Sequence, residues 1–124
     1  MWIDTRITFF DNTTNEAILE NDGTIYKDEF NGNKYPHDVI DNLKSQYIAA
    51  TIENTPKELN IDYTYNAYWL PIVINLNDLI TYNSNPYNHE NDEIQHYNFL
   101  YENLKIHINK DIDPNNISVV IEFF

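Results

Sequence analysis

The chain contains no cysteine among its 124 residues. This absence excludes a disulfide framework, a thiolate nucleophile and a cysteine-ligated zinc site. Glycine is limited to Gly23 and Gly32, so the sequence has no glycine-rich loop to hold a phosphate. No apolar run approaches the roughly 18 residues of a membrane-spanning helix, and the first residues do not form a signal peptide pattern. We therefore expect a cytoplasmic protein with no cofactor and no membrane partner.

Basic residues are also scarce. The chain has 7 Lys and Arg against 20 Asp and Glu, for a formal net charge of -13. Its 20 Asn and 17 Ile indicate a gene rich in A and T, which should also raise lysine, yet only 6 lysines occur. Solubility of a small domain requires a net charge of only about 2–8 in magnitude. The lysine deficit therefore indicates selection for a negative surface, which repels nucleic acid and membranes and attracts a basic protein.

One stretch concentrates this charge. No Lys or Arg occurs between Lys57 and Lys105. The same stretch holds seven of the ten tyrosines, and tyrosine is a favoured anchor at protein interfaces. Its acidic residues are Glu58, Asp62, Asp78, Glu90, Asp92, Glu93 and Glu102.

Hydrophobic residues make up 42% and aromatic residues 15% of the chain, too much for a disordered acidic tail. The length fits one acidic domain over residues 1–124. Alternating apolar residues predict strands at 3–9, 59–65 and 117–123, and residues 24–28 are predicted to form a hairpin with 16–20. Residues 67–75 are apolar on both faces, which predicts a further strand that is buried on both sides or faces a partner. Helical spacing predicts helices at 36–53 and about 94–108, with a loop at 83–86 between them. The order β-β-β-α-β-β-α-β predicts an α+β fold with two helices on a mostly antiparallel sheet.

Signals for catalysis and for metal binding are weak. No serine stands in a Gly-x-Ser-x-Gly turn. His89 and His96 are seven residues apart, which separates them by about 10.5 Å on a helix, too far to share an ion. The interpretation is therefore that the chain is not an enzyme and has no catalytic or metal-binding residues.

A weaker alternative is a calcium-binding module. Residues from Asp111 to Glu122 resemble the EF-hand loop, with oxygen ligands at its first, third, fifth and twelfth positions. Asn116 replaces the glycine of the sixth position, and only two residues follow Glu122, so no exit helix can form.

The leading hypothesis is a small acidic inhibitor that binds a basic nucleic-acid-handling enzyme, possibly by nucleic-acid mimicry, because carboxylates can bind Lys and Arg in place of phosphates. In charge and size the chain resembles phage proteins of the anti-CRISPR and anti-restriction kinds, which would place it in the host cytoplasm. The alternative is an immunity protein for a cognate toxin such as a nuclease. Neither hypothesis includes direct binding of nucleic acid.

The candidate partner-binding residues come from the base-free stretch and from the hairpin. Glu90, Asp92 and Glu93 also have a simpler reading, as complements to a helix dipole. The primary candidates are Glu90, Asp92, Glu93, Tyr82, Tyr87 and Glu102, and the secondary candidates are Asp11, Glu16, Glu20, Asp22, Asp28 and Glu29.

Overall fold

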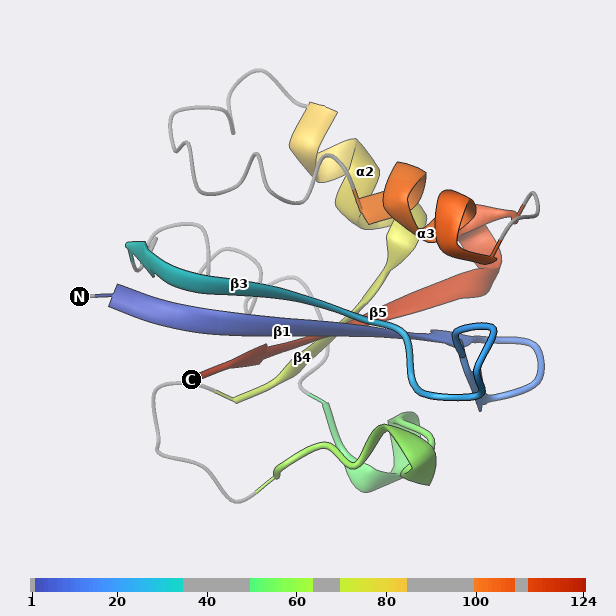
Figure 1. The fold of residues 1–124 in the computed structure, drawn as a ribbon, viewed down its shortest axis with the longest axis horizontal. Helices are drawn as coiled ribbons and strands as arrows, with labels where there is room; N and C mark the ends of the chain where they lie inside the picture. Colours follow the sequence, from blue (N-terminus) through green and yellow to red (C-terminus); the bar gives the residue numbers. More distant parts are fainter. Residues whose placement is uncertain (1, 35–49, 64–69, 85–99, 109–111) are drawn as a thin grey trace.

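A computed structural model describes residues 2–34, 50–63, 70–84, 100–108 and 112–124 (Figure 1). These residues form five strands and two α-helices, which confirms the α+β class and the approximate order of elements. The strands are β1 (Trp2–Asp11), β2 (Glu16–Ala17), β3 (Lys27–Lys34), β4 (Ile72–Asn75) and β5 (Ile117–Phe123). The helices are α2 (Leu76–Ser84) and α3 (Leu100–Ile108), and short 3-10 turns are η1 (Ile52–Asn54), η2 (Lys57–Leu59) and η5 (Pro114–Asn116).

The sheet is built around β1. Strand β5 pairs with one side of β1, and β4 pairs with the far side of β5. Both β2 and β3 pair with the other side of β1, β2 at its end and β3 along most of its length. Each pairing among the described strands is antiparallel, in agreement with the predicted mostly antiparallel sheet. The β1–β3 register shifts between Ile3 and Thr5, so that two residues of β3 lie opposite Asp4.

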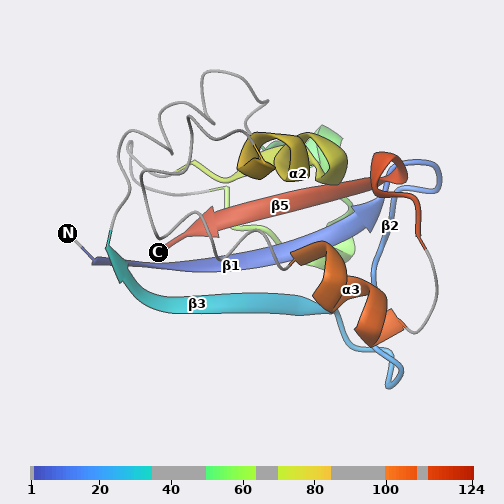
Figure 2. The same ribbon diagram turned by 90° about the horizontal axis from the view of Figure 1, so that it is seen from above.

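The two faces of the sheet carry separate cores. On one face Ile7 and Phe9 of β1 pack with Leu76 and Leu79 of α2 and with Leu104 of α3. Figure 2 shows α2 above β5 and α3 above β3 on this face. The strands are therefore buried against the helices on one side, and the segment from 50 to 63 covers the other side (Figure 1).

The second core is smaller. Phe10 and Val120 face the covering segment, which contributes Ala50, Leu59 and Ile61. The amide nitrogen of Ala50 donates to the carbonyl oxygen of Pro71 at 2.8 Å, which ties the start of this segment to the residue before β4. Central strand β5 is buried along its whole length as a result, because side chains from both faces are covered.

Several predicted elements are confirmed. Strands β1 and β5 match the alternating patterns at 3–9 and 117–123. The hairpin is present as a bridge between Leu19 and Ile25 around a turn in which Gly23 takes a φ of +88°. That backbone conformation favours glycine. Helix α3 directs Leu104 into the core, with Tyr101 and Ile108 packed against it.

Helix α2 was not predicted, and the loop assigned to residues 83–86 was wrong at its start because the helix runs to Ser84. Asn75 explains how the helix begins directly after β4. Its Oδ1 accepts from the amide nitrogens of Asn77 at 2.9 Å and Asp78 at 3.3 Å, which satisfies two amides of the first turn. The strand therefore passes into the helix through an asparagine cap.

The strand predicted for 59–65 was wrong over its described part. Residues Lys57–Leu59 form a 3-10 turn, and Asn60 follows it in the left-handed conformation with a φ of 50°. The strand predicted for 67–75 is shorter, since β4 begins only after Pro71, which cannot donate a ladder hydrogen bond. The predicted helix at 36–53 lies mostly outside the described residues, and its last part is the 3-10 turn η1 instead.

Candidate functional site

Most of the primary candidates lie outside the described residues. This applies to Glu90, Asp92, Glu93 and Tyr87, and to the side chain of Tyr82, whose backbone belongs to α2. Glu102 is described, in the first turn of α3. Its carboxylate lies 3.2 Å from the Lys105 ammonium, so part of its charge is balanced within the helix. The proposed acidic face before α3 stays a prediction.

Two secondary candidates stabilise turns. Oδ1 of Asp11 accepts from the amide and the hydroxyl of Thr13, at 2.7 and 2.6 Å. Oδ1 of Asp22 accepts in the same way from Thr24, at 2.9 and 2.6 Å. Asp22 is nevertheless exposed at the hairpin tip.

Glu16 and Glu20 belong to the same end of the sheet. Glu16 is exposed on β2, and Glu20 is partly exposed and accepts from the Thr24 hydroxyl at 3.4 Å. Strand β2 contacts the turn η2, where Glu58 is exposed. The described structure thus places the hairpin strand β2 beside the covering segment, a proximity that the sequence pattern did not indicate.

Asp28 has a structural role. The hydroxyl of Tyr26 donates to its two carboxylate oxygens at 3.2 and 3.1 Å, and Tyr26 is fully buried against Phe9. Burial raises the pKa of Asp28, while Tyr26 and His107 of α3 act in the opposite direction. The His107 ring lies 4.6 Å from the Tyr26 ring. Asp28 therefore joins β3 to the α3 side of the core.

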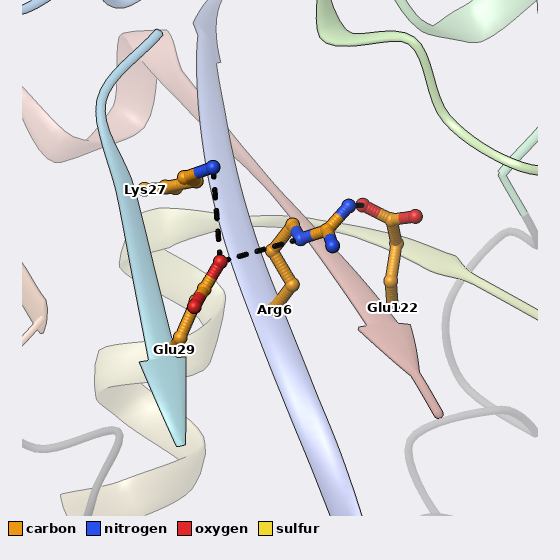
Figure 3. Close-up of polar contacts among 4 residues, drawn as sticks. All are labelled: Arg6, Lys27, Glu29 and Glu122. Atoms are coloured by element: carbon orange, nitrogen blue, oxygen red, sulfur yellow. Dashed lines mark ion pairs between the residues drawn. The ribbon is translucent and has the colours of Figure 1, made fainter. Parts of the chain in front are cut away.

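Glu29 belongs to an ion-pair network across three elements of the sheet. Figure 3 shows Arg6 of β1 between Glu29 of β3 and Glu122 of β5. Arg6 Nε lies 3.6 Å and Lys27 Nζ 3.7 Å from Glu29 Oε1, and Arg6 Nη1 lies 4.0 Å from Glu122 Oε1. The Arg6 guanidinium also lies 4.8 Å from the ring centre of Phe124. The Arg6 side chain thus forms ion pairs with two carboxylates and also contacts an aromatic ring.

Glu122 is the unusual member of this network, because its side chain is only 4% exposed whereas that of Arg6 is 40% exposed. Burial raises the pKa of Glu122; Arg6 and a hydrogen bond from the Asp62 backbone amide act against that rise. In the sequence, Glu122 is notable only as the last ligand of the EF-hand-like loop. No local pattern reveals its partner, because Arg6 lies at the opposite end of the chain.

The structure gives no support to the EF-hand reading. Strand β5 carries Glu122 roughly 16 Å from Ile117, at about 3.3 Å per residue, and thus away from Asp113. Oδ1 of Asp113 instead accepts from the Asn115 amide at 2.9 Å and caps η5. Within the described parts of the chain, no group of three or more metal-ligating side chains is placed to hold an ion.

Thr8 lies on the same face of β1 as Arg6, and it is only 2% exposed. Its hydroxyl oxygen is buried with no hydrogen-bond partner. We expect Thr8→Val to raise the free energy of unfolding by about 1 kcal/mol, because the variant keeps the shape and removes an unsatisfied polar group. Urea denaturation measures the change, and a loss of stability would show that the hydroxyl does have a partner.

The balance of surface charge can be read from the described side chains. Arg6, Lys27 and Lys105 are held in internal ion pairs. Exposed carboxylates for which the described residues provide no ion pair occur on several elements. They are Glu16 on β2, Glu53 on η1, Glu58 on η2 and Asp78 on α2. Negative charge therefore faces outward on both sides of the sheet and at the hairpin end.

No helix within the described ranges is both long and apolar enough to cross a membrane. Comparisons of the chain with protein-family models, with curated proteins and with solved structures find no match.

Proposed function

We propose that this chain is a protein-binding inhibitor that neutralises a basic, nucleic-acid-handling enzyme. Surface carboxylates would bind the Lys and Arg side chains that otherwise hold phosphates, in charge-assisted hydrogen bonds. The proposal depends on one observation, the surplus of outward-facing carboxylates over cations. The formal net charge is -13. Of the four basic side chains that the structure describes, Arg6, Lys27 and Lys105 are paired within the molecule and Lys57 is exposed on η2.

The internal ion pairs strengthen the charge argument. A cation that is held by a neighbouring carboxylate contributes little to the potential felt by a distant molecule, whereas unpaired carboxylates contribute fully. Electrostatic attraction of this kind accelerates the encounter with an oppositely charged protein and disfavours like-charged partners.

We predict that the protein itself binds neither DNA nor RNA. Phosphate binding needs several Lys or Arg on one surface, and the chain has only 7 in total. Gel-shift titrations with single-stranded and duplex oligonucleotides at low salt should leave the nucleic acid unshifted. A clear shift would remove the basis of the proposal.

The direct test is competition. The immobilised protein should capture a basic enzyme from a lysate of its host at low salt, and the capture should weaken at high salt as exposed charges are screened. The purified pair is then challenged with the nucleic acid substrate of that enzyme. If the carboxylates replace phosphates, the inhibitor and the nucleic acid should exclude each other from the enzyme, and the enzyme should lose activity. The proposal would be contradicted if the captured enzyme bound substrate and inhibitor together and kept its activity. If the captured enzyme were a toxic nuclease, the inhibitor would be identified as an immunity protein.

Charge reversal locates the binding face. We expect the double variant Glu90→Lys, Glu93→Lys to abolish capture while the protein stays folded, because like charges then meet at the interface. The matched control is Glu53→Lys with Glu58→Lys, which changes the net charge by the same amount on the covering segment. Equal weakening by the two pairs would indicate a general charge effect rather than a face.

The helix-dipole reading makes a different prediction for the first pair. If Glu90 and Glu93 only complement the dipole of a helix, their reversal slightly lowers the melting temperature and leaves capture intact. The next pair to test is then Glu16→Lys with Glu20→Lys at the hairpin, where both side chains reach solvent. Capture assays at two salt concentrations distinguish the three outcomes, which are a binding face at Glu90 and Glu93, a general charge effect, and a face elsewhere.

A further inference from the structure

The hairpin tip contains the sequence Asp22–Gly23, in which one residue can react with the next. The backbone nitrogen of a glycine can attack the side-chain carboxyl carbon of a preceding aspartate, since no glycine side chain obstructs the approach. Here Asp22 is exposed, Gly23 has a φ of +88°, and nothing lies within 4 Å of the place that a Cβ would occupy. Crowding therefore does not protect this peptide unit.

The reaction is an isomerisation that needs no external reagent besides water. The Gly23 nitrogen forms a bond to the side-chain carboxyl carbon of Asp22, and the hydroxyl oxygen of the protonated carboxyl group leaves as water together with the proton lost by the nitrogen. The resulting five-membered imide is then hydrolysed at either carbonyl. One opening restores aspartate, and the other gives isoaspartate, in which the main chain runs through the former side chain and is one methylene longer.

Both reacting groups are held by hydrogen bonds in the folded chain. The Gly23 nitrogen donates to the carbonyl oxygen of Glu20 at 3.0 Å, which opposes its use as a nucleophile. Oδ1 of Asp22 accepts from the Thr24 hydroxyl at 2.6 Å and from the Thr24 amide at 2.9 Å. These contacts fix the carboxylate toward Thr24.

The Thr24 contacts also act on the charge of the carboxyl group. The hydrogen bond from the Thr24 side chain, followed by that from its amide, lowers the pKa of Asp22. An ionised carboxylate cannot lose water, because the oxygen that leaves must first be protonated. A lower pKa therefore reduces the reactive population at any given pH above it.

We infer that the Asp22–Gly23 peptide unit is a latent isoaspartate site, which the Thr24 hydroxyl holds in an unreactive arrangement. The Asp22–Gly23 unit lies inside the hydrogen bonds that close the hairpin. The Glu20 amide donates to the Thr24 carbonyl at 2.7 Å, and Leu19 forms a β-bridge with Ile25. Isomerisation would lengthen the turn inside this ring of contacts. It would thereby shift Glu20, one of the candidate partner-binding carboxylates, but the inference holds whether or not the proposed function is correct.

The test compares the wild-type protein with three variants during prolonged incubation at mildly acidic pH. Thr24→Val removes the hydroxyl and keeps the amide, whereas Thr24→Ser keeps both donors. Thr13→Val is the matched control, because Thr13 makes the same two contacts to Asp11, and Asp11 is followed by asparagine. Peptide mapping with fragmentation that distinguishes isoaspartate from aspartate measures the rate at residue 22, and it separates this site from Asn31–Gly32, where deamidation changes the mass.

We expect Thr24→Val to accelerate isoaspartate formation at residue 22 by about two- to tenfold, the factor that one hydrogen bond of ordinary net strength represents. Thr24→Ser and Thr13→Val should match the wild-type rate. Circular dichroism before incubation checks that each variant is folded. Equal rates in wild type and Thr24→Val would overturn the inference, as would a folded wild-type protein that isomerises as fast as the same chain in concentrated urea.

Discussion

Replacing Leu104 with alanine is expected to lower the free energy of unfolding by about 2–5 kcal/mol. Leu104 is fully buried at the contact between α3 and the sheet. Its truncation removes apolar contacts and leaves a cavity that the surrounding β-sheet can fill only in part. Because small domains are stable by only about 5–15 kcal/mol, the variant should unfold at a much lower urea concentration.

The same helix supplies the control. Ile106 lies two residues away and is 74% exposed, so Ile106→Ala should change stability by no more than about 0.5 kcal/mol. Alanine is also the better helix former, which offsets any small loss of contact. Similar effects of the two substitutions would show that α3 is not docked through Leu104.

Arg6→Ala is expected to cost about 2–4 kcal/mol near neutral pH, because it leaves the Glu122 carboxylate buried without its cation. The lower part of that range reflects the 40% exposure of Arg6, which lets water screen the pair. Glu122→Gln in the Arg6→Ala background should recover much of the loss, since a neutral amide can still accept from the Asp62 backbone. Failure of this rescue would indicate that Arg6 acts through its packing on Phe124 instead.

The pH dependence of this loss has a definite sign. The folded protein holds the Glu122 proton more tightly than the unfolded chain, because the pKa is raised from its ordinary value of 4.5. The contribution of Glu122 to stability is therefore greatest below that value, and it is lost as pH rises through the folded pKa. Arg6→Ala should raise that pKa further, so the gap between variant and wild type should widen with rising pH and narrow in acid. A gap independent of pH would contradict this explanation.

The parts of the fold that could be predicted are those in which local pattern and final environment agree. Residues of β1 alternate because one side faces the helices and the other side faces the covering segment. In α3 the spacing of Tyr101, Leu104 and Ile108 places all three on the core side. The pairing of Leu19 with Ile25 follows from the glycine in the intervening turn.

The segment from Leu59 to Tyr63 shows how a correct pattern can give a wrong element. Leu59 and Ile61 are buried and Tyr63 is half-buried, so alternation did predict which side chains face inward. The backbone is not a strand, because η2 and the left-handed Asn60 turn the chain instead. Helix α2 was not predicted because its apolar stripe is too short to give a helical pattern. Its start is defined instead by the side chain of Asn75, which caps the first turn.

The candidate site was less predictable than the fold. Charge counts single out acidic residues as a class, but they cannot separate Glu16, which is exposed, from Asp28, which binds Tyr26. The network of Arg6, Glu29 and Glu122 depends on strands that are distant in sequence and adjacent in the sheet. Such pairing is a property of topology and has no local signature.

The register shift in β3 has a consequence for behaviour in concentrated solution. Asn31 and Gly32 together lie opposite Asp4, so the strand has a bulge within its length. A regular strand from another molecule could not continue its hydrogen-bond ladder past that point. The irregular spacing makes β3 a poor template for fibril growth, even at a pH close to the sequence pI of about 4.3, where the repulsion between molecules disappears.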